Sequence, residues 1–276
     1  MPIKNDANET EMTMNGFKRP DAEKIAQIVK ISERLIRLHE CGALGGEIMP
    51  EDSNPGLPKD SESNFMFFTL PMALNYQRNS YHLWESAKNT YEDTDTADVF
   101  SPNIVVNMQT NELRDKLLKY KVALQPNKHP EIWMRLCQTF VSDFEGSVKN
   151  FLYQNALTVA SIKAYMGANK KMFPYLSGTK IMNYWLYVIS QYTEVVFADK
   201  ENITVAPDTH VLQASVRLGL IEPDEMSNPN IREIVSDLWN IVFAETSLNP
   251  IDIHTPLWLW SRSGFIVDVM KDEYSK

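Results

Sequence analysis

Two side chains of this sequence could together perform chemistry on a sugar carbon: Lys180 and, 28 residues later, Asp208. Lys180 precedes one of the most apolar stretches of the chain, so its amine could be partly desolvated. Desolvation lowers the pKa of a lysine and frees its lone pair to attack the carbon and form a Schiff base. The Asp208 carboxylate could stabilise the positive charge that develops, or help to activate the nucleophile. The alternatives are a surface lysine and a helix N-cap aspartate.

The segment before Lys180 reads Phe-Pro-Tyr-Leu-Ser-Gly-Thr over residues 173–179 and lies between two expected helices. A tight turn at Gly178 would leave backbone N–H groups at the start of the second helix available to an anion, assisted by the helix dipole. A DNA phosphate bound there would be held without regard to base sequence. We therefore expect DNA contacts from Ser177, Gly178 and Thr179, with Lys171 adding another unless it is simply a solvated surface charge.

Apolar residues that recur at helical spacing predict an all-α protein, in keeping with only 10 glycines and few alternating β-branched runs. Residues 1–20 are expected to form a disordered tail, 42–63 a long loop, and 197–207 an irregular segment. Asp21 and Asp208 are expected to cap helices. Helices are expected over 21–38, 67–74, 81–91, 112–120, 130–143, 147–166, 180–192, 208–218, 230–246 and 255–271.

The formal net charge of −9 argues against a generally basic DNA-binding surface. Net charge, however, governs solubility and long-range steering rather than the chemistry of one site. Part of the acidic excess lies in the N-terminal tail and in the stretch 92–98. The net negative charge of the chain is therefore compatible with a local site that binds DNA.

Cys41 and Cys137 are far apart and form no metal-ligand pattern, which favours a reducing compartment. The N-terminal residues lack the apolar stretch of a signal peptide, and no apolar run is long enough to span a membrane. We expect a soluble cytoplasmic protein that associates with the nucleoid, without a membrane partner.

Several motifs resemble the helix–hairpin–helix DNA glycosylases, and within them most closely the archaeal 8-oxoguanine (GO) glycosylases. The resemblance rests first on Leu-Ser-Gly-Thr-Lys over 176–180, the apolar helix after it, and Ala-Pro-Asp over 206–208. The likeness spans roughly residues 65–265, and its further motifs are Lys-Ile-Met-Asn-Tyr-Trp (180–185), Val-Ala-Pro-Asp (205–208), 237–246, 252–258, 73–77 and 82–84.

This resemblance implies the helix–hairpin–helix fold, with two helical subdomains flanking a base-binding cleft. One subdomain would comprise residues 21–70 and 193–276, and the other residues 71–192, with the motif at about 148–192. The implied activity is that of a DNA glycosylase that flips and excises a modified base, with 8-oxoguanine the first candidate. Schiff-base AP-lyase activity through Lys180 would accompany it, with double-stranded DNA as the partner of a monomer.

The resemblance also implies a base pocket with Trp84 and Trp258 as stacking residues, although both could instead be core residues. His254 stands where the archaeal proteins carry a carboxylate, which would change how the base edge is read. Gln77 would fill the hole left by the flipped base and Arg78 would touch phosphate, unless this stretch is merely an exposed loop. No cofactor is implied, because the iron–sulphur cysteines are missing; the hairpin could hold a structural monovalent cation.

Three alternatives stay open at this stage. In a second alignment register the nucleophile position falls on Phe173, and Asp208 then acts alone on a water in a glycosylase without lyase activity. The substrate could be another modified base, such as a hypermodified phage cytosine, which would indicate a role in defence. The chain could also be a non-catalytic DNA-binding helical module.

Overall fold

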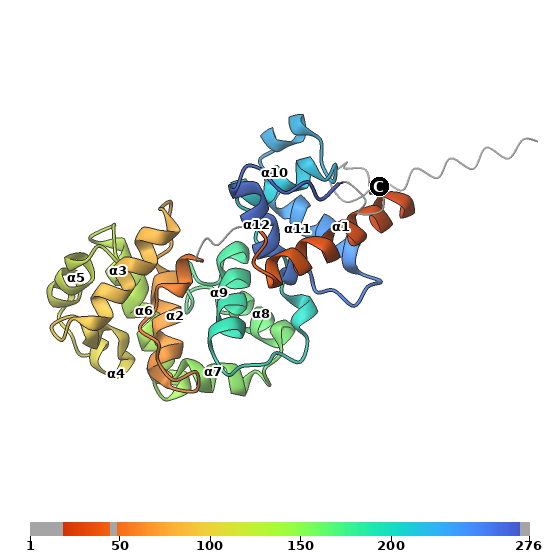
Figure 1. Cartoon of the computed structure of the whole chain (residues 1–276). Helices are drawn as coiled ribbons and strands as arrows, with labels where there is room; N and C mark the ends of the chain where they lie inside the picture. Colours follow the sequence, from red (N-terminus) through yellow and green to blue (C-terminus); the bar gives the residue numbers. More distant parts are fainter. Residues whose placement is uncertain (1–18, 45–48, 271–276) are drawn as a thin grey trace, which may run out of the picture. The chain divides into compact units, whose positions relative to one another are not determined.

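Figure 1 shows a computed structural model of the chain, which describes residues 19–44 and 49–270. These residues form 12 α-helices and several short 3-10 helices, and no strand occurs among them. The predicted all-α class is therefore confirmed. The tail predicted for residues 1–20 falls almost entirely outside the described residues.

The chain forms two compact units, and each is described by itself. Unit 1 comprises residues 1–45 and 207–276, and unit 2 comprises residues 46–206. These bounds differ from the expected ones, because 46–70 and 193–206 belong to unit 2. The reason is tertiary: α2 (Glu62–Ala73) is apolar all round and packs against α3, α7 and α9 of the same unit.

Unit 1 is built on the packing of its first and last helices. The apolar side of α1 carries Ile28, Ile31 and Leu35 and packs against α11 and α12, while α10 also packs against α12 (Figure 1). Burial of these apolar surfaces is the main source of stability of such a unit. Its elements are α1 (Ala22–Glu40), α10 (Thr209–Arg217), η5 (Pro223–Ser227), α11 (Ile231–Phe243), η6 (Pro250–Ile253) and α12 (His254–Arg262).

Unit 2 surrounds α2, whose residues from Asn64 to Ala73 are all buried. Buried polar groups of this helix are paired: the Asn64 amide donates to the Tyr192 carbonyl (2.8 Å), and the Thr69 hydroxyl accepts from the Trp185 indole (3.1 Å). The other elements are η2 (Pro50–Asp52), α3 (Ser80–Glu92), η3 (Ala97–Phe100), α4 (Pro102–Val105), α5 (Thr110–Lys119), α6 (Lys128–Phe144), α7 (Val148–Gln154), α8 (Val159–Ala168), α9 (Thr179–Tyr192) and η4 (Lys200–Asn202).

The single helix expected over 147–166 is wrong, since the structure has two helices, α7 and α8. Ala156 and Leu157 between them have positive φ angles of 56° and 51°, which end the first helix. The second helix starts because the Asp199 carboxylate accepts from the first amides of α8, Val159 N (2.5 Å) and Ala160 N (2.9 Å). That cap comes from 40 residues away, so local periodicity could not reveal it.

The last helix also ends earlier than expected, at Arg262 rather than at residue 271. Gly264 has a φ of 73°, and the amide of Phe265 bonds back to the Trp260 carbonyl at 3.0 Å. A glycine in the left-handed region with a bond of this kind is a common helix C-terminus. Gly264 is therefore a local sequence signal for the end of this helix, which the spacing of apolar residues does not reveal.

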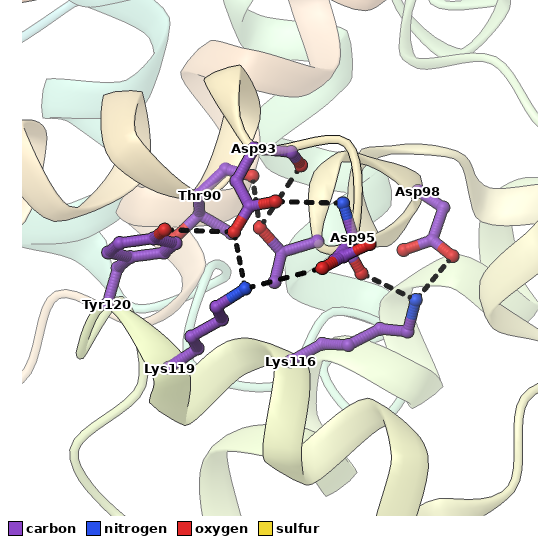
Figure 2. A network of polar contacts seen from close by, with 8 residues as sticks. Thr90, Asp93, Asp95, Asp98, Lys116, Lys119 and Tyr120 are labelled. Atoms are coloured by element: carbon purple, nitrogen blue, oxygen red, sulfur yellow. Dashed lines mark hydrogen bonds and ion pairs between the residues drawn. The ribbon is translucent and has the colours of Figure 1, made fainter.

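The acidic stretch after α3 is neutralised within unit 2, as Figure 2 shows. Lys119 Nζ lies 2.6 Å from Asp93 Oδ2, the Tyr120 hydroxyl donates to the same carboxylate, and Lys116 Nζ lies 2.7 Å from Asp98 Oδ2. The Lys119 contact holds the pKa of Asp93 at about 2, well below its usual value. This stretch thus adds less free negative charge than the sequence count suggests.

A buried carboxyl joins η2 to α9. Glu51 is 1% exposed, and its Oε1 accepts a hydrogen bond from the Tyr184 hydroxyl at 2.9 Å. Its neighbour Asp52 is exposed and accepts from the Tyr192 hydroxyl at 2.7 Å. Burial raises the pKa of Glu51 to about 7, because the charged form is poorly solvated there.

Candidate functional site

Asp208 is fixed at the start of α10 in unit 1. As predicted, it is the N-cap residue: its Oδ1 accepts from the Val211 amide at 3.0 Å. Its other oxygen, Oδ2, accepts from the indole Nε1 of Trp258 at 3.1 Å. The segment before it is held by Arg232, whose Nη1 donates to the Pro207 carbonyl at 2.5 Å. The result is an oriented carboxylate at the positive end of a helix dipole.

Trp258, half-buried on α12, makes three described contacts around its ring. Besides the bond to Asp208, the Arg262 guanidinium lies over the ring, 5.0 Å from its centroid. The His210 ring meets it in an edge arrangement with centroids 5.5 Å apart. A base that stacked on the ring face covered by Arg262 would have to displace the guanidinium. The sequence, which suggested a stacking role, gave no sign of the bond to Asp208.

His210 is half-buried, and it belongs to a chain of polar contacts that links α10 and α12. The Ser261 hydroxyl donates to Gln213 Oε1 at 3.0 Å, and His210 Nδ1 lies 3.4 Å from the same hydroxyl oxygen. This chain fixes the ring that borders Trp258.

Lys180 lies in the first turn of α9, as the hairpin register requires. Its side chain is exposed, so the partial desolvation expected from the apolar sequence after it is not found in unit 2. In the second alignment with the glycosylases the nucleophile position falls on Phe173, which is 0% exposed and packs against Phe140 and Phe151. Only the alignment guided by the hairpin therefore puts an accessible side chain, that of Lys180, at the start of the helix.

In the turn before α9, the backbone amides of Ser177 and Gly178 donate hydrogen bonds to carbonyl groups of the same turn. Ser177 N bonds to the Phe173 carbonyl and Gly178 N to the Tyr175 carbonyl, each at 3.0 Å. A Cβ at Gly178 would lie 3.2 Å from the Tyr175 carbonyl oxygen, which favours glycine at this N-cap. A phosphate at this end of α9 would therefore rely on the first helical turn, Thr179 onward, and not on the amides of Ser177 and Gly178 as expected.

The turn contacts the loop that carries Gln77, within unit 2. Tyr175, itself at a positive φ of 65°, donates its hydroxyl to the Asn75 carbonyl and meets the Tyr76 ring edge-on with centroids 5.9 Å apart. Lys128 Nζ lies 5.8 Å from the Tyr76 ring centroid. Gln77 is exposed with a φ of 43°. Two segments expected to contact DNA are thus adjacent, although 100 residues separate Asn75 from Tyr175.

Arg78 differs from its neighbour Gln77, because it is directed into unit 2. Its Nη1 donates to the Val122 carbonyl at 2.9 Å, and burial lowers its pKa. Nearby, His129 is 1% exposed and its Nδ1 accepts from the Leu124 amide at 3.1 Å. These two bonds fix the loop after α5, so the phosphate contact expected of Arg78 is replaced by a structural role.

We expect His129 to make this loop sensitive to acid. Burial, with help from Arg78 and Lys128, lowers the pKa of His129 from 6.5 to about 4. The stability that neutral His129 contributes is therefore complete above pH 6.5 and is lost as the pH falls to 4, by about 3 kcal/mol in total. In His129→Asn, the side-chain oxygen of asparagine can still accept from the Leu124 amide, and the asparagine amide stays neutral at every pH. Urea denaturation across this pH range should show a shallower loss of stability for His129→Asn than for the wild type.

The exposed His82 provides the control, because His82→Asn makes the same substitution at the surface of α3, outside this loop. It should leave the pH dependence of the wild type unchanged. Parallel stability curves for His129→Asn and the wild-type protein would show that the loop does not sense pH through His129.

The remaining pocket candidates, Trp84 and His254, are both buried. Trp84 is 0% exposed and packs against Phe67 and Phe68, with ring centroids 6.0 and 5.6 Å away. Of its two considered roles the structure supports the core one, because a base could not reach the ring without repacking the unit. His254 is 5% exposed, one helical turn before Trp258 on α12. Lys171 is exposed in the turn before α9.

Metal and membrane features were also sought in the described part of the chain. No cluster of three or more histidine, cysteine, aspartate or glutamate side chains there is arranged to hold a metal ion. Cys41 is exposed, Cys137 is buried, and neither forms a disulfide. None of the helices in residues 19–44 and 49–270 has the length and apolar character needed to cross a bilayer.

Comparison with known proteins adds no family. The chain matches no protein-family model, and no curated protein sequence is significantly similar to it. The fold and geometry by themselves define an all-α protein of two units. One unit presents an oriented aspartate at a helix N-terminus, and the other a lysine at the start of a helix.

Proposed function

We propose that this protein is a DNA glycosylase of the helix–hairpin–helix type that flips a modified base out of double-stranded DNA and excises it. The observation that carries the proposal is the geometry of Asp208. It is a helix N-cap whose two carboxylate oxygens accept separate hydrogen bonds, from Val211 N and Trp258 Nε1. The motif resemblance and the exposed Lys180 at the start of α9 support it.

In this reaction Asp208 supplies negative charge where positive charge develops. As the bond between base and sugar breaks, C1′ becomes oxocarbenium-like, and a fixed carboxylate stabilises that state more than the ground state. A carboxylate that already has its orientation needs little reorganisation during the step. The two hydrogen bonds of Asp208 provide this orientation.

The proposed nucleophile is Lys180. Its neutral amine attacks C1′, and the base leaves with the electrons of the bond to the sugar. Nitrogen then loses a proton to water as the C1′–O4′ bond breaks, which opens the sugar ring and gives the Schiff base. Loss of a C2′ proton finally expels the 3′ phosphate by β-elimination, which is the AP-lyase step. Unit 2 supports this role by placing Lys180 in the first helical turn, next to the turn that contacts the Gln77 loop. Gln77 is proposed to occupy the gap left by the flipped base, and Thr179 and Lys171 to contact phosphate.

The test is base release from a panel of duplexes, each with one modified base and including 8-oxoguanine, followed by borohydride trapping. We expect release from at least one duplex and a covalent complex that is lost in Lys180→Gln. Lys170→Gln is the matched control, because it removes an exposed lysine from the connection before α9 to which the proposal gives no role, and it should still trap. Absence of release from every duplex would count against the proposal.

A second candidate, a glycosylase without lyase activity, is favoured by one observation: the exposure of Lys180. An exposed amine lacks the desolvation that would free its lone pair. In this route Asp208 stabilises the sugar and a water attacks C1′. Base release by the wild-type protein without borohydride trapping would identify it, and duplexes with hypermodified cytosines extend the panel to a defence substrate.

A further inference from the structure

We propose that Trp258 is a positioning residue for Asp208, acting through its indole N–H, and that this role is separate from any stacking on a base. The inference rests on the proposed function and deepens it. Its basis is the 3.1 Å contact from Trp258 Nε1 to Asp208 Oδ2, which joins α12 to the first residue before α10. Both residues lie in unit 1.

The first step concerns the freedom of the carboxylate. The amide of Val211 holds the carboxylate through Oδ1 alone, and a single hydrogen bond tolerates some rotation about the bond between Cβ and the carboxyl carbon. The indole N–H binds Oδ2 and so narrows this rotation. With both oxygens held, the carboxylate keeps one plane. A hydrogen bond to an ionised group is also stronger than one between neutral groups.

The second step concerns the Trp258 indole, which is the hydrogen-bond donor. It can hold the Asp208 carboxylate in one orientation only if its own ring is held in place. Arg262 lies over the Trp258 ring at 5.0 Å, and the His210 ring meets it edge-on at 5.5 Å. His210 in turn contacts Ser261, which donates to Gln213. Trp258, Ser261 and Arg262 share one side of α12 by their spacing, and Trp258 and Ser261 contact side chains of α10. The indole therefore cannot turn without losing several contacts.

Removal of the indole N–H should therefore lower the rate of base release and leave the affinity for DNA unchanged. The test compares two replacements of Trp258. One is phenylalanine, and the other is 3-benzothienylalanine, which keeps the size and stacking face of the ring but has sulfur in place of N–H. Single-turnover base release at saturating enzyme should slow by about 10- to 100-fold in both variants. The half-saturating enzyme concentration should change little in the benzothienyl variant.

Trp260→Phe is the matched control. Trp260 lies on the same helix, and its indole also donates one hydrogen bond, at 2.8 Å, but to the Val267 carbonyl. Its loss should lower stability without slowing base release at saturation. A wild-type rate in the benzothienyl variant, with a raised half-saturating concentration in Trp258→Phe, would show a stacking role only and would overturn the proposal.

A second measurement needs no activity. In a ¹H–¹⁵N spectrum, the indole signal of Trp258 is identified by its loss in Trp258→Phe. It should shift and exchange faster with solvent in Asp208→Asn, where an NH2 group replaces the oxygen that accepts from the indole, while the signal of Trp260 stays in place. An unmoved Trp258 signal overturns the positioning. A shifted signal in a protein that releases no base from any duplex overturns the proposed function instead, and this separates the two failures.

Discussion

Asp208→Asn is expected to slow base release by about 100- to 1,000-fold while the protein stays folded. Asparagine is as good an N-cap as aspartate, so the bond to the Val211 amide and the start of α10 can be retained. Its NH2 group then takes the place of the oxygen that accepts from Trp258, so that hydrogen bond is lost. The substitution therefore removes the negative charge together with the acceptor for Trp258, and with the charge the stabilisation of the oxocarbenium-like sugar. Single-turnover assays on the responsive duplex measure the effect.

The matched control is Asp21→Asn. Asp21 caps α1 of the same unit, and its carboxylate accepts from the Lys24 amide at 2.8 Å. Both variants lose one charge at a helix N-terminus, so they should lose similar stability, while only Asp208→Asn should lose activity. Equal activity of Asp208→Asn and the wild-type protein would favour a non-catalytic DNA-binding module.

Glu51→Gln is expected to remove a large loss of stability at alkaline pH. The pKa of Glu51 is raised by burial from 4.5 to about 7, so the folded state favours its neutral form. The stability that this group contributes is complete below pH 4.5 and is lost as the pH rises through 7, by about 3 kcal/mol in total. Glutamine is neutral at every pH and keeps an oxygen for the Tyr184 hydroxyl.

Urea denaturation at a series of pH values checks this prediction. The wild type and Glu51→Gln should be similar near pH 4.5, and the variant should be the more stable protein above pH 8. Asp52→Asn is the control, because Asp52 is adjacent and also accepts a tyrosine hydroxyl of α9, but is exposed. It should follow the wild-type curve. A Glu51→Gln curve that does the same would mean that Glu51 is solvated in solution.

The local elements of this fold could be predicted from the sequence, because the residues that decide them are neighbours. Asp21 and Asp208 were expected as N-caps and both accept from the amide three residues on. The all-α class followed from apolar spacing, which fixes the buried side of each helix before any packing is known. Lys180 was likewise expected, and found, at a helix start.

Only the tertiary structure decided which polar side chains bind which. The Asp199 cap of α8 and the Trp258 bond to Asp208 join residues 40 and 50 positions apart. Sequence spacing carries no information about such pairs, because each depends on how separate helices pack. The same reason explains the inward direction of Arg78 and the burial of Trp84, which the sequence could equally place at a surface.

For the candidate site, the sequence thus supplied the residue types and the helix ends on which Lys180 and Asp208 lie. The tertiary structure supplied their environments, which differ from the expected ones. Lys180 is exposed despite the apolar helix that follows it, because solvation depends on what covers a side chain and not on its neighbours in sequence. Asp208 is oriented by an indole from another helix, because packing of α10 against α12 brings the two together.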